Sequence, residues 1–536
     1  MRSLALDTMR SAASLVIDPV EATVAAAGAG VAGLRDQVSR AVGGLLDVGS
    51  GRRRRHVWTR PGHAHIEVRG LTGHGTTHRR VAHAAETAVG RLRGVRWADV
   101  NGVTGQLLVA FDPDAVTLER LVAVVEASEQ AVSTDDEEFP WSRPNHPADP
   151  APLVASSVAL AGDVLGMGAA TAMWLARAPA LPNGVRAVVG VLQAQPRLRR
   201  QLERWLGPPG TEFLLGVADA VVQAGTQDPG TLAVDAVHRV MIIAEVSARR
   251  AVWAAWEPTV ELSAFPPPPE APVVPGRDEE LPAGAVETYA ELAAAGSLLA
   301  STAATLLGRP GLGAQVSLVG MPRAARLGRE AFAATLARGL TDRGMVPLDG
   351  SAYRRLDRIT HVVLDLRVLP EAAPGRAAGA EALEAVMEAA QHAGTEVSVV
   401  APTTDPEGLE LSLATRVRQL QADGHGVLLL AAADDAALEA ADVAVAIWRE
   451  HNPVCWAADL ISDGLEPAIA LLGALPAARR ASRRGVALAL AGSSTGLLSA
   501  VLLPGPGSTT RALLPVHVAG LAALVSGHRT AALPRG

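Results

Sequence analysis

The sequence predicts a mixed α/β protein with α-helical membrane segments, and three observations lead to that fold class. Residues 345–478 alternate short apolar runs with helical patterns, which is typical of a parallel sheet covered by helices. Residues 63–132 carry patterns in the order β-α-β-β-α, which indicates a small ferredoxin-like α+β module. Residues 486–503 contain no charge and are long enough to cross a thin bilayer as a helix of about 27 Å.

The composition excludes several classes of function. The 536 residues include 48 basic and 55 acidic side chains, and the net charge of -7 argues against a nucleic-acid partner. A single cysteine, Cys455, excludes an intrachain disulfide and a CxxC metal site. All 48 basic residues are arginine, because the chain has no lysine. A Walker A loop, a protein kinase site and Schiff-base chemistry each need a lysine and are therefore excluded.

The N-terminal part is expected to contain a helix, the α+β module and a linker. Residues 1–55 combine an amphipathic helix with a basic linker, which either contacts an anionic membrane face or is solvated. Residues 133–152 are acidic and contain prolines, as linkers do. Within residues 63–132 the patterns place strands at 65–68, 97–100 and 106–111, and helices at 76–92 and 118–129.

The middle of the chain predicts helices on both sides of a second linker. Residues 153–262 form a helical region, and its first part, 153–175, is a candidate membrane helix with Asp163 as the only charge. Residues 263–285 include four consecutive prolines and are expected to be an extended linker. The apolar segments within residues 286–344 are further candidate membrane helices.

The segment 486–526 predicts a transmembrane helical hairpin. Two apolar stretches, 486–503 and 512–526, are separated by a Pro-Gly-Pro-Gly sequence. Arginines flank both ends of the pair, and only Arg511 lies at the tip, which predicts that both ends face the cytoplasm. A helical hairpin buried in a soluble domain is the alternative. Ahead of the hairpin, the runs 362–364, 397–401, 427–430 and 443–447 predict the strands of the parallel sheet.

A run of residues from Pro322 to Asp365 carries a specific spacing. Pro322 is followed by Gly344-Met345, then by Asp349-Gly350, and then by the segment Ala352–Asp365. Without gaps over 44 residues, this order resembles the heavy-metal cation-transporting P-type ATPase family. In that family a membrane proline precedes a Gly-Ile pair, a glycine loop, an ALERLxxVDTVVFD strand and the phosphorylated aspartate of DKTGT.

Two downstream stretches extend the resemblance. Val417–Gly424 is similar to the family's VxxLQxxG helix end, and Ala436–Ala446 is similar to APALAxADVGIA. The resemblance implies that residues 345–478 form a HAD-like, Rossmannoid phosphorylation domain and that 63–132 is a heavy-metal-associated-like module. The whole arrangement resembles the N-terminal half of large bacterial cation-transport ATPases.

The resemblance also implies a site, and this sequence departs from it. Asp365 occupies the phosphorylation position, but the motif reads Asp-Leu-Arg-Val-Leu, with Arg367 beside the nucleophile. The magnesium loop has alanine at its first aspartate position, which leaves only Asp434 and Asp435 displaced from it. Thr403 is what remains of the TGD loop, and too few residues separate it from Asp365 for an inserted ATP-binding domain. The phosphorylation domain is therefore expected to be degenerate.

The metal-transport motifs are changed as well. The membrane proline is flanked by Met321 and Arg323 instead of cysteines. The position of the GMTCxxC loop in the α+β module has no cysteine. His74, His78 and His83 are present there, and their imidazoles are candidate ligands for Zn²⁺ or Ni²⁺. Solvated loop histidines are the alternative.

Two functions follow from this combination. The first is a membrane-associated P-type ATPase-like pseudoenzyme with a regulatory or partner role, located in the cell membrane with its α/β domain in the cytoplasm. The second is a residual cation-translocating ATPase that forms an aspartyl-phosphate at Asp365. Mg²⁺ and ATP are expected as cofactors only in the second case. The expected partners are the membrane and either a complete P-type ATPase or another copy of the chain.

Overall fold

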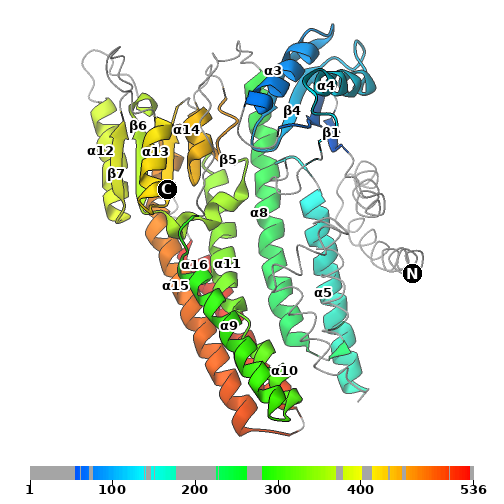
Figure 1. The fold of residues 1–536 in the computed structure, drawn as a ribbon, viewed down its shortest axis with the longest axis vertical. Helices are drawn as coiled ribbons and strands as arrows, with labels where there is room; N and C mark the ends of the chain where they lie inside the picture. Colours follow the sequence, from blue (N-terminus) through cyan, green and yellow to red (C-terminus); the bar gives the residue numbers. More distant parts are fainter. Residues whose placement is uncertain are drawn as a thin grey trace.

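The computed structural model contains a small antiparallel unit, a parallel α/β domain and a group of long helices that extend away from both (Figure 1). Three expected site residues, His74, Thr403 and Asp434, lie outside the described residues, as does nearly all of the expected helix in 1–55. The structure describes residues 55–60, 62–71, 76–137, 139, 146–149, 151–176, 222, 225–226, 228–261, 281–369, 378–400, 413–432, 435–448, 454–505 and 507–531.

The small unit, residues 57–132, is a four-stranded sheet with two helices on one face. Its neighbouring strands are all antiparallel, in the order β1-β2-β4-β3. Every element of the expected β-α-β-β-α order is present, and β1 is an additional edge strand that the sequence patterns did not indicate. The elements are β1 (Val57–Arg60), β2 (His63–Glu67), α3 (Thr76–Gly90), β3 (Val95–Asn101), β4 (Gln106–Phe111) and α4 (Leu118–Val132).

Strand β4 is buried along its whole length because both faces of the sheet are covered. Leu107 and Val109 pack with Val81 of α3 and Leu121 of α4 on one face. Leu108 points to the other face and joins a separate apolar cluster. A strand with one face in water would alternate apolar and polar residues, and β4 does not. The second face must therefore pack against another part of the molecule.

The α/β domain contains a six-stranded sheet in the order β5-β10-β9-β8-β6-β7. All neighbouring strands are parallel except β5, which is antiparallel to β10. Strands β6 to β9 match the four predicted ones. β5 and β10 were not predicted, because three and four residues are too few to show a period. The strands are β5 (Met345–Pro347), β6 (His361–Asp365), β7 (Glu396–Val400), β8 (Val427–Ala431), β9 (Val443–Trp448) and β10 (Leu460–Asp463).

Helices cover both faces of this sheet, which explains its continuous apolar strands. Alternate residues of β6, such as Leu364 and Val363, enter different clusters on the two faces. One face packs against α11 (Arg323–Thr341), α12 (Ala378–His392) and α15 (Leu465–Leu502), and the other against α13 (Leu413–Ala422) and α14 (Asp435–Ala440).

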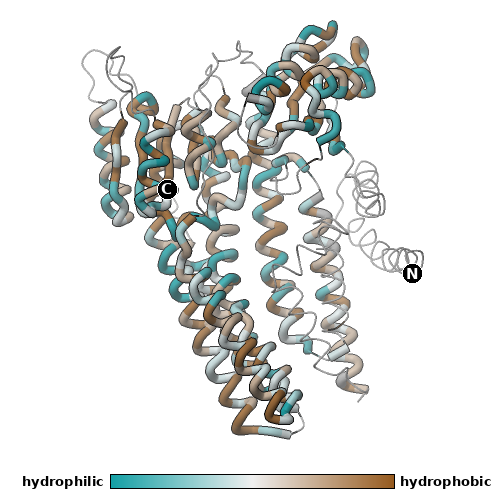
Figure 2. Tube along the Cα trace, viewed as in Figure 1, coloured by the Kyte–Doolittle hydropathy of each residue, from teal (hydrophilic) through white to brown (hydrophobic). Residues whose placement is uncertain are grey.

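Three helices in the described part of the chain are long and apolar enough to cross a membrane. They are α5 (Ala151–Leu175), α15 and α16 (Ser508–Thr530). The helices of the predicted hairpin are therefore present, and Figure 2 shows apolar residues along the part of α15 that lies away from the α/β domain. The first helix is longer than predicted. It begins at Leu465, directly after β10, and runs 38 residues without interruption.

The candidate membrane helices predicted within residues 286–344 are not among these three. The segment is helical, but α9 (Ala285–Leu306) carries Glu287 and Glu291, and α10 (Pro310–Val319) has only ten residues. Small side chains and two acidic groups lower the mean hydropathy of α9. The helix also carries exposed leucines, and the Leu299 residue is 72% exposed. Helices α9 and α10 instead pack beside α15 (Figure 1).

Glycines allow α11, α15 and α16 to pack closely. A Cβ atom at Gly485 of α15 would lie 2.9 Å from the carbonyl oxygen of Ala325 in α11. At Gly527 of α16 it would lie 2.1 Å from the carbonyl oxygen of Gly328. Such small-residue contacts are how membrane helices approach one another without a hydrophobic driving force.

Helix α5 packs along α8 (Pro229–Glu261), and an ion pair joins the two. Arg239 of α8 donates from Nε to Oδ2 of Asp163 at 2.6 Å, and the Asp163 side chain is 6% exposed. The only acidic residue of the candidate spanning helix is thus paired, as an ionised group at membrane depth requires.

Candidate functional site

Asp365 lies at the carboxyl end of β6, the strand between β8 and the edge strand β7. Asp365 is in register with Val400 of β7. The residue before it, Leu364, is in register with Leu430 of β8. Because β6, β7 and β8 are parallel, the segments that follow them leave the sheet at the same edge. Parallel α/β sheets bind their ligands at this edge. The topology therefore brings the carboxyl ends of the strands that precede the predicted phosphorylation, TGD and magnesium segments to one edge of the sheet.

The Asp365 carboxylate is fully engaged by the protein. Nε of Arg367 donates to Oδ1 at 3.0 Å and to Oδ2 at 2.8 Å. The backbone N–H of Arg367 donates to Oδ1 at 3.0 Å, so that Asp365 also caps the short helix η4 (Leu366–Val368). The backbone N–H of Ala432 approaches Oδ2 at 3.4 Å. The Asp365 side chain is 1% exposed and that of Arg367 is 40% exposed, so the guanidinium separates the carboxylate from solvent.

This arrangement is unfavourable for nucleophilic attack. A carboxylate that forms an acyl-phosphate needs a free oxygen aimed at phosphorus and a metal ion to neutralise the phosphate. Here both oxygens accept charge-assisted or backbone hydrogen bonds, and such bonds to Arg are among the stronger ones in proteins. The sequence predicted Arg367 near the phosphate position. The structure places it on the Asp365 carboxylate.

Both backbone groups of Ala432, the residue directly after β8, face other parts of the protein. Ala432 directs its N–H at Asp365, and its carbonyl oxygen lies 3.5 Å from the Cys455 thiol. Cys455 is buried, as expected for an unreactive thiol. Asp435 is the first residue of α14, and the described residues do not include its side chain or Asp434. The magnesium assignment for these two aspartates therefore stays a prediction.

The histidines of the small unit lie on different faces of α3. His78 is half-buried and His83 is exposed. Five residues separate them, which turns their side chains about 140° apart around the helix. Within the described residues, the group of three ligands that approach closely enough for a metal includes neither. His74 lies outside those residues.

The proline of the predicted membrane metal motif lies at the N-terminal end of α11. Next to it, Arg323 donates from Nη2 to both carboxylate oxygens of Asp235 in α8, at 2.9 and 2.8 Å. The resemblance placed cysteine ligands around this proline. One of those positions is occupied by an ion pair between two helices.

The second face of the small unit packs against a cluster of tryptophans that sequence reasoning missed. The indole Nε1–H of Trp456 donates to Oδ2 of Asp99 in β3 at 2.8 Å, and the carbonyl oxygen of Trp456 accepts from Val103 at 3.3 Å. Burial raises the pKa of Asp99, and the Trp456 hydrogen bond opposes that rise. We call this cluster the tryptophan joint, formed by Trp58, Trp97, Trp253, Trp256, Trp448 and Trp456.

A buried chain of hydrogen bonds fixes α8 in this joint. Nδ1 of His146 accepts from the Ala148 N–H at 3.1 Å and lies 3.2 Å from Nδ1 of His65. Nε2 of His65 lies 3.1 Å from Oε1 of Glu257, and Oε2 of Glu257 accepts from the indole N–H of Trp253 at 3.1 Å. These contacts connect β2 of the small unit to α8. Burial, then the charge of His65, holds the pKa of His146 well below its usual value, which keeps it an acceptor.

The sequence contained one signal for the joint. A strand with five consecutive apolar residues, as β4 has after Gln106, indicates that both faces of its sheet are covered. Which segments cover the second face depends on tertiary contacts between residues far apart in the chain, such as Trp456 and Asp99.

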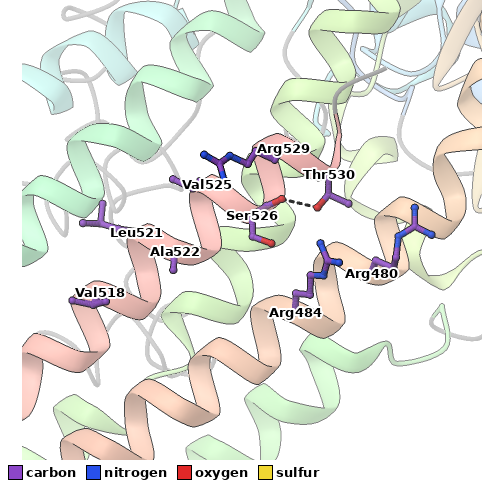
Figure 3. Close-up of a pocket in the computed structure, with 9 residues that line it drawn as sticks. All are labelled: Arg480, Arg484, Val518, Leu521, Ala522, Val525, Ser526, Arg529 and Thr530. Atoms are coloured by element: carbon purple, nitrogen blue, oxygen red, sulfur yellow. Dashed lines mark hydrogen bonds between the residues drawn. The ribbon is translucent and has the colours of Figure 1, made fainter. Parts of the chain in front are cut away.

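The membrane hairpin has a basic end. An open groove of about 800 Å³ lies between α15 and α16, and Figure 3 shows Arg480, Arg484 and Arg529 around it. The rest of the lining includes apolar residues of α16, among them Leu521 and Val525. Arginines that border apolar helices are typical of the cytoplasmic boundary of a membrane protein.

Known proteins that are similar to this chain are named as cation-transporting ATPases. No family model matches the chain. A protein of Mycobacterium tuberculosis named "Probable cation-transporting ATPase I" is 32% identical over 602 aligned positions, which cover 84% of this chain and 36% of that protein. A protein of the same name in Mycobacterium leprae is 28% identical over 590 aligned positions, which cover 83% of this chain and 36% of that protein. The chain thus spans only 36% of the length of these relatives.

Two solved structures of a zinc-transporting PIB-type ATPase, captured in two different states, are also similar. The first has a TM-score of 0.33 and 11% identity, and covers 66% of this chain and 100% of that one. The second has a TM-score of 0.39 and 13% sequence identity, and the match covers 69% of this chain and 99% of that one.

Proposed function

Because the chain is a distant homologue of cation-transporting P-type ATPases, we propose that it is a membrane-embedded, catalytically degenerate relative of these pumps with a regulatory or partner role. The observation that carries the proposal is the Asp365–Arg367 ion pair, in which the guanidinium contacts both oxygens of the nucleophile. The Arg323–Asp235 ion pair beside the membrane proline supports it, because a guanidinium repels the cation that would have to pass.

We further propose that the chain crosses the cell membrane several times with its α/β domain in the cytoplasm. The support is the basic groove at the end of the hairpin nearest this domain and the continuity of α15 from the sheet into the apolar hairpin. Alkaline carbonate extraction of membranes tests the placement. The full chain should stay in the pellet, and release into the supernatant would show that α15 and α16 do not span the bilayer.

The proposed partner is a complete P-type ATPase. This chain matches only 36% of the length of the mycobacterial relatives that are named as ATPases. In those proteins the matched part is joined to further segments, which supports a partnership between this chain and a complete pump. The test is the ATPase rate of a complete pump in vesicles with and without the chain. A changed rate supports the partnership. An unchanged rate, together with self-association by light scattering, would favour a second copy of the chain as the partner.

Phosphorylation tests the loss of catalysis. Purified full-length chain is incubated with γ-labelled ATP and Mg²⁺, beside its Asp365→Asn variant and an active P-type ATPase as a positive control. We expect no acid-stable, hydroxylamine-sensitive label above that of the variant. Loss of any one such catalytic group usually lowers a rate by orders of magnitude, and here several are changed together.

Residual cation transport is the second candidate function. The name of the mycobacterial relatives favours it, and so does the aspartate at the end of β6. It requires Mg²⁺ and ATP, which would have to displace Arg367 from Asp365. A hydroxylamine-sensitive label that the Asp365→Asn substitution removes would establish this function and contradict the first proposal.

A further inference from the structure

The edge of the α/β sheet opposite Asp365 carries three side chains that metal ions prefer. His361 begins β6, Glu396 begins β7, and His425 lies two residues before β8. His361 is in register with Glu396 on one side and with Val427 on the other. Because these neighbouring strands are parallel, their amino ends bring the three side chains together. The sequence alone did not indicate this cluster, because Glu396 and His425 lie 35 and 64 residues after His361 in the chain.

The distances suit a shared ion. One ligand atom from each of the three residues lies within 4.8 Å of the other two. Nδ1 of His361 is 3.5 Å from Oε2 of Glu396, and the two imidazole rings are 5.5 Å apart between centroids. A tetrahedral zinc ion with bonds of about 2.0–2.1 Å holds its ligand atoms about 3.3 Å apart. The His361–Glu396 pair already has nearly that spacing.

Nδ1 of His361 is buried and has no hydrogen-bond partner within the described part of the chain. The whole residue is 4% exposed. Its other ring nitrogen, Nε2, lies 2.8 Å from the Ser398 hydroxyl, and Arg416 donates to that same hydroxyl at 3.0 Å. When Nε2–H donates to Ser398, Nδ1 carries a lone pair that faces a carboxylate. Two such electron-rich atoms are stable together only with a proton or a cation between them.

The second histidine is held in a comparable way. Nδ1 of His425 lies 3.1 Å from the Thr360 hydroxyl, whose oxygen also accepts from the Gly426 N–H at 3.2 Å. Donation from Nδ1–H to Thr360 leaves Nε2 of His425 as the metal-binding nitrogen. Metal-ligating histidines usually have their second nitrogen oriented by such a partner. Both rings of the cluster therefore have one nitrogen fixed and the other available.

The site is accessible from solvent. The Glu396 side chain is 75% exposed, so an ion and a water molecule can enter from that side.

We propose that His361, Glu396 and His425 bind one divalent transition-metal ion, zinc by the chemistry of the ligand set, with water in the fourth position. Two imidazoles and one carboxylate are a zinc-binding set with one open coordination site. The site lies at the other end of β6 from Asp365, about 13 Å away along the strand. It is also separate from the histidines of α3.

Zinc titration of the full-length chain in detergent tests the proposal, with calorimetry and a competing chelator as readouts. We expect one equivalent to bind to the unmodified chain. His425→Gln and Glu396→Gln should each weaken this binding by at least 10-fold to 100-fold, because each removes a ligand. Substitution with Co²⁺ should give a visible absorption band that both variants lose. Neither residue is in a packed core, so circular dichroism should show both variants folded.

Matched controls separate this site from other histidines. His392→Gln changes an exposed histidine at the end of α12, close in sequence to Glu396, and should leave zinc binding unchanged. His83→Gln does the same for the exposed histidine of α3. The proposal is overturned if the unmodified chain binds no zinc, if both site variants bind it as tightly as before, or if His83→Gln removes the bound equivalent.

Discussion

Two side chains in the loop after β6 determine what that end of the sheet can do. Arg367 lies two residues after Asp365 in a tight 3-10 turn, which brings its Nε within 3.0 Å of both carboxylate oxygens. The same turn in a chain with a small hydroxyl residue would leave the carboxylate open to a ligand. The residue two positions after Asp365 therefore decides whether its carboxylate is open or held in an ion pair.

Removing the guanidinium should destabilise the domain. In Arg367→Ala, the Asp365 carboxylate remains buried with only backbone donors, and we expect a loss of about 1–2 kcal/mol in the free energy of unfolding. The double variant Asp365→Asn/Arg367→Ala should recover part of it, because no charge is then left unpaired. Urea denaturation of the detergent-solubilised chain measures both. Arg480→Ala, at an exposed arginine, is the control, and an equal loss there would contradict the interpretation.

Asp459 makes the stability of the same domain depend on pH. It accepts the Ala444 N–H at 2.9 Å and pairs with Arg355 at 3.1 Å. Burial is the largest cause that raises its pKa to about 6, Arg355 opposes the rise, and Asp349 adds to it. The folded state therefore holds the proton more tightly than the unfolded state, whose pKa is about 3.9.

The sign of the effect follows from this difference. The contribution of Asp459 to stability is fully present below about pH 4 and is lost as the pH rises through about 6, by at most about 3 kcal/mol. Asp459→Asn should flatten this part of the profile. Denaturation curves at several pH values between 4 and 7 measure it, and the difference between the two proteins isolates Asp459 from His146, whose lowered pKa acts in the opposite direction. An identical slope in both proteins would rule the effect out.

At the scale of elements, the tryptophan joint decides how the small unit is positioned. Trp456 is 6% exposed and packs against Trp253 and Trp256 with ring centroids 6.2 and 5.9 Å apart. Its carbonyl oxygen and its indole N–H both bind the small unit. The sheet of that unit uses one face for its own helices and the other for this contact, so the unit is not an independent module on a linker.

Trp456→Ala should release the small unit from the α/β domain. Truncating a buried tryptophan costs about 3–5 kcal/mol, and this loss falls on the joint rather than on either core. Hydrogen exchange should become faster in β3 and β4 while β8 stays protected. Trp456→Phe keeps most of the packing and removes only the hydrogen bond to Asp99, so its effect should be about 1 kcal/mol. Equal exchange in all three proteins would contradict this role of the joint.

Particular elements show what the sequence could and could not predict. Strands β6, β8 and β9 were predictable because both faces of a parallel sheet need apolar residues, and each is an apolar run. β5 and β10 were not, because so few residues carry no periodicity. At the site, the sequence placed Asp365 and Arg367 together, since they are two residues apart. It missed His361, Glu396 and His425, which only strand register brings together.

At the scale of the whole molecule, close helix packing joins the membrane hairpin to the α/β domain. Helices α11, α15 and α16 meet at glycines along their length. We expect Gly527→Ala to lower the melting temperature of the chain in detergent, because its Cβ would lie 2.1 Å from a backbone oxygen that no rotamer change can move. The control is Gly473→Ala in α15, where no atom lies within 4 Å, and which should leave stability unchanged or raise it. Equal melting temperatures would show that α11 and α16 can separate freely.

The continuity of α15 has a mechanical consequence. Pro476 lies inside this helix where it packs against the sheet, and proline removes one helical hydrogen bond, so the natural point of bending lies at the domain and not in the membrane. From there to Leu502 the helix is a lever of about 39 Å. A tilt of only about 5° at the domain would displace the far end of the helix by about 3 Å, which is close to the distance between two side chains in contact. Small rearrangements of the sheet are thereby amplified at the far tip of the hairpin.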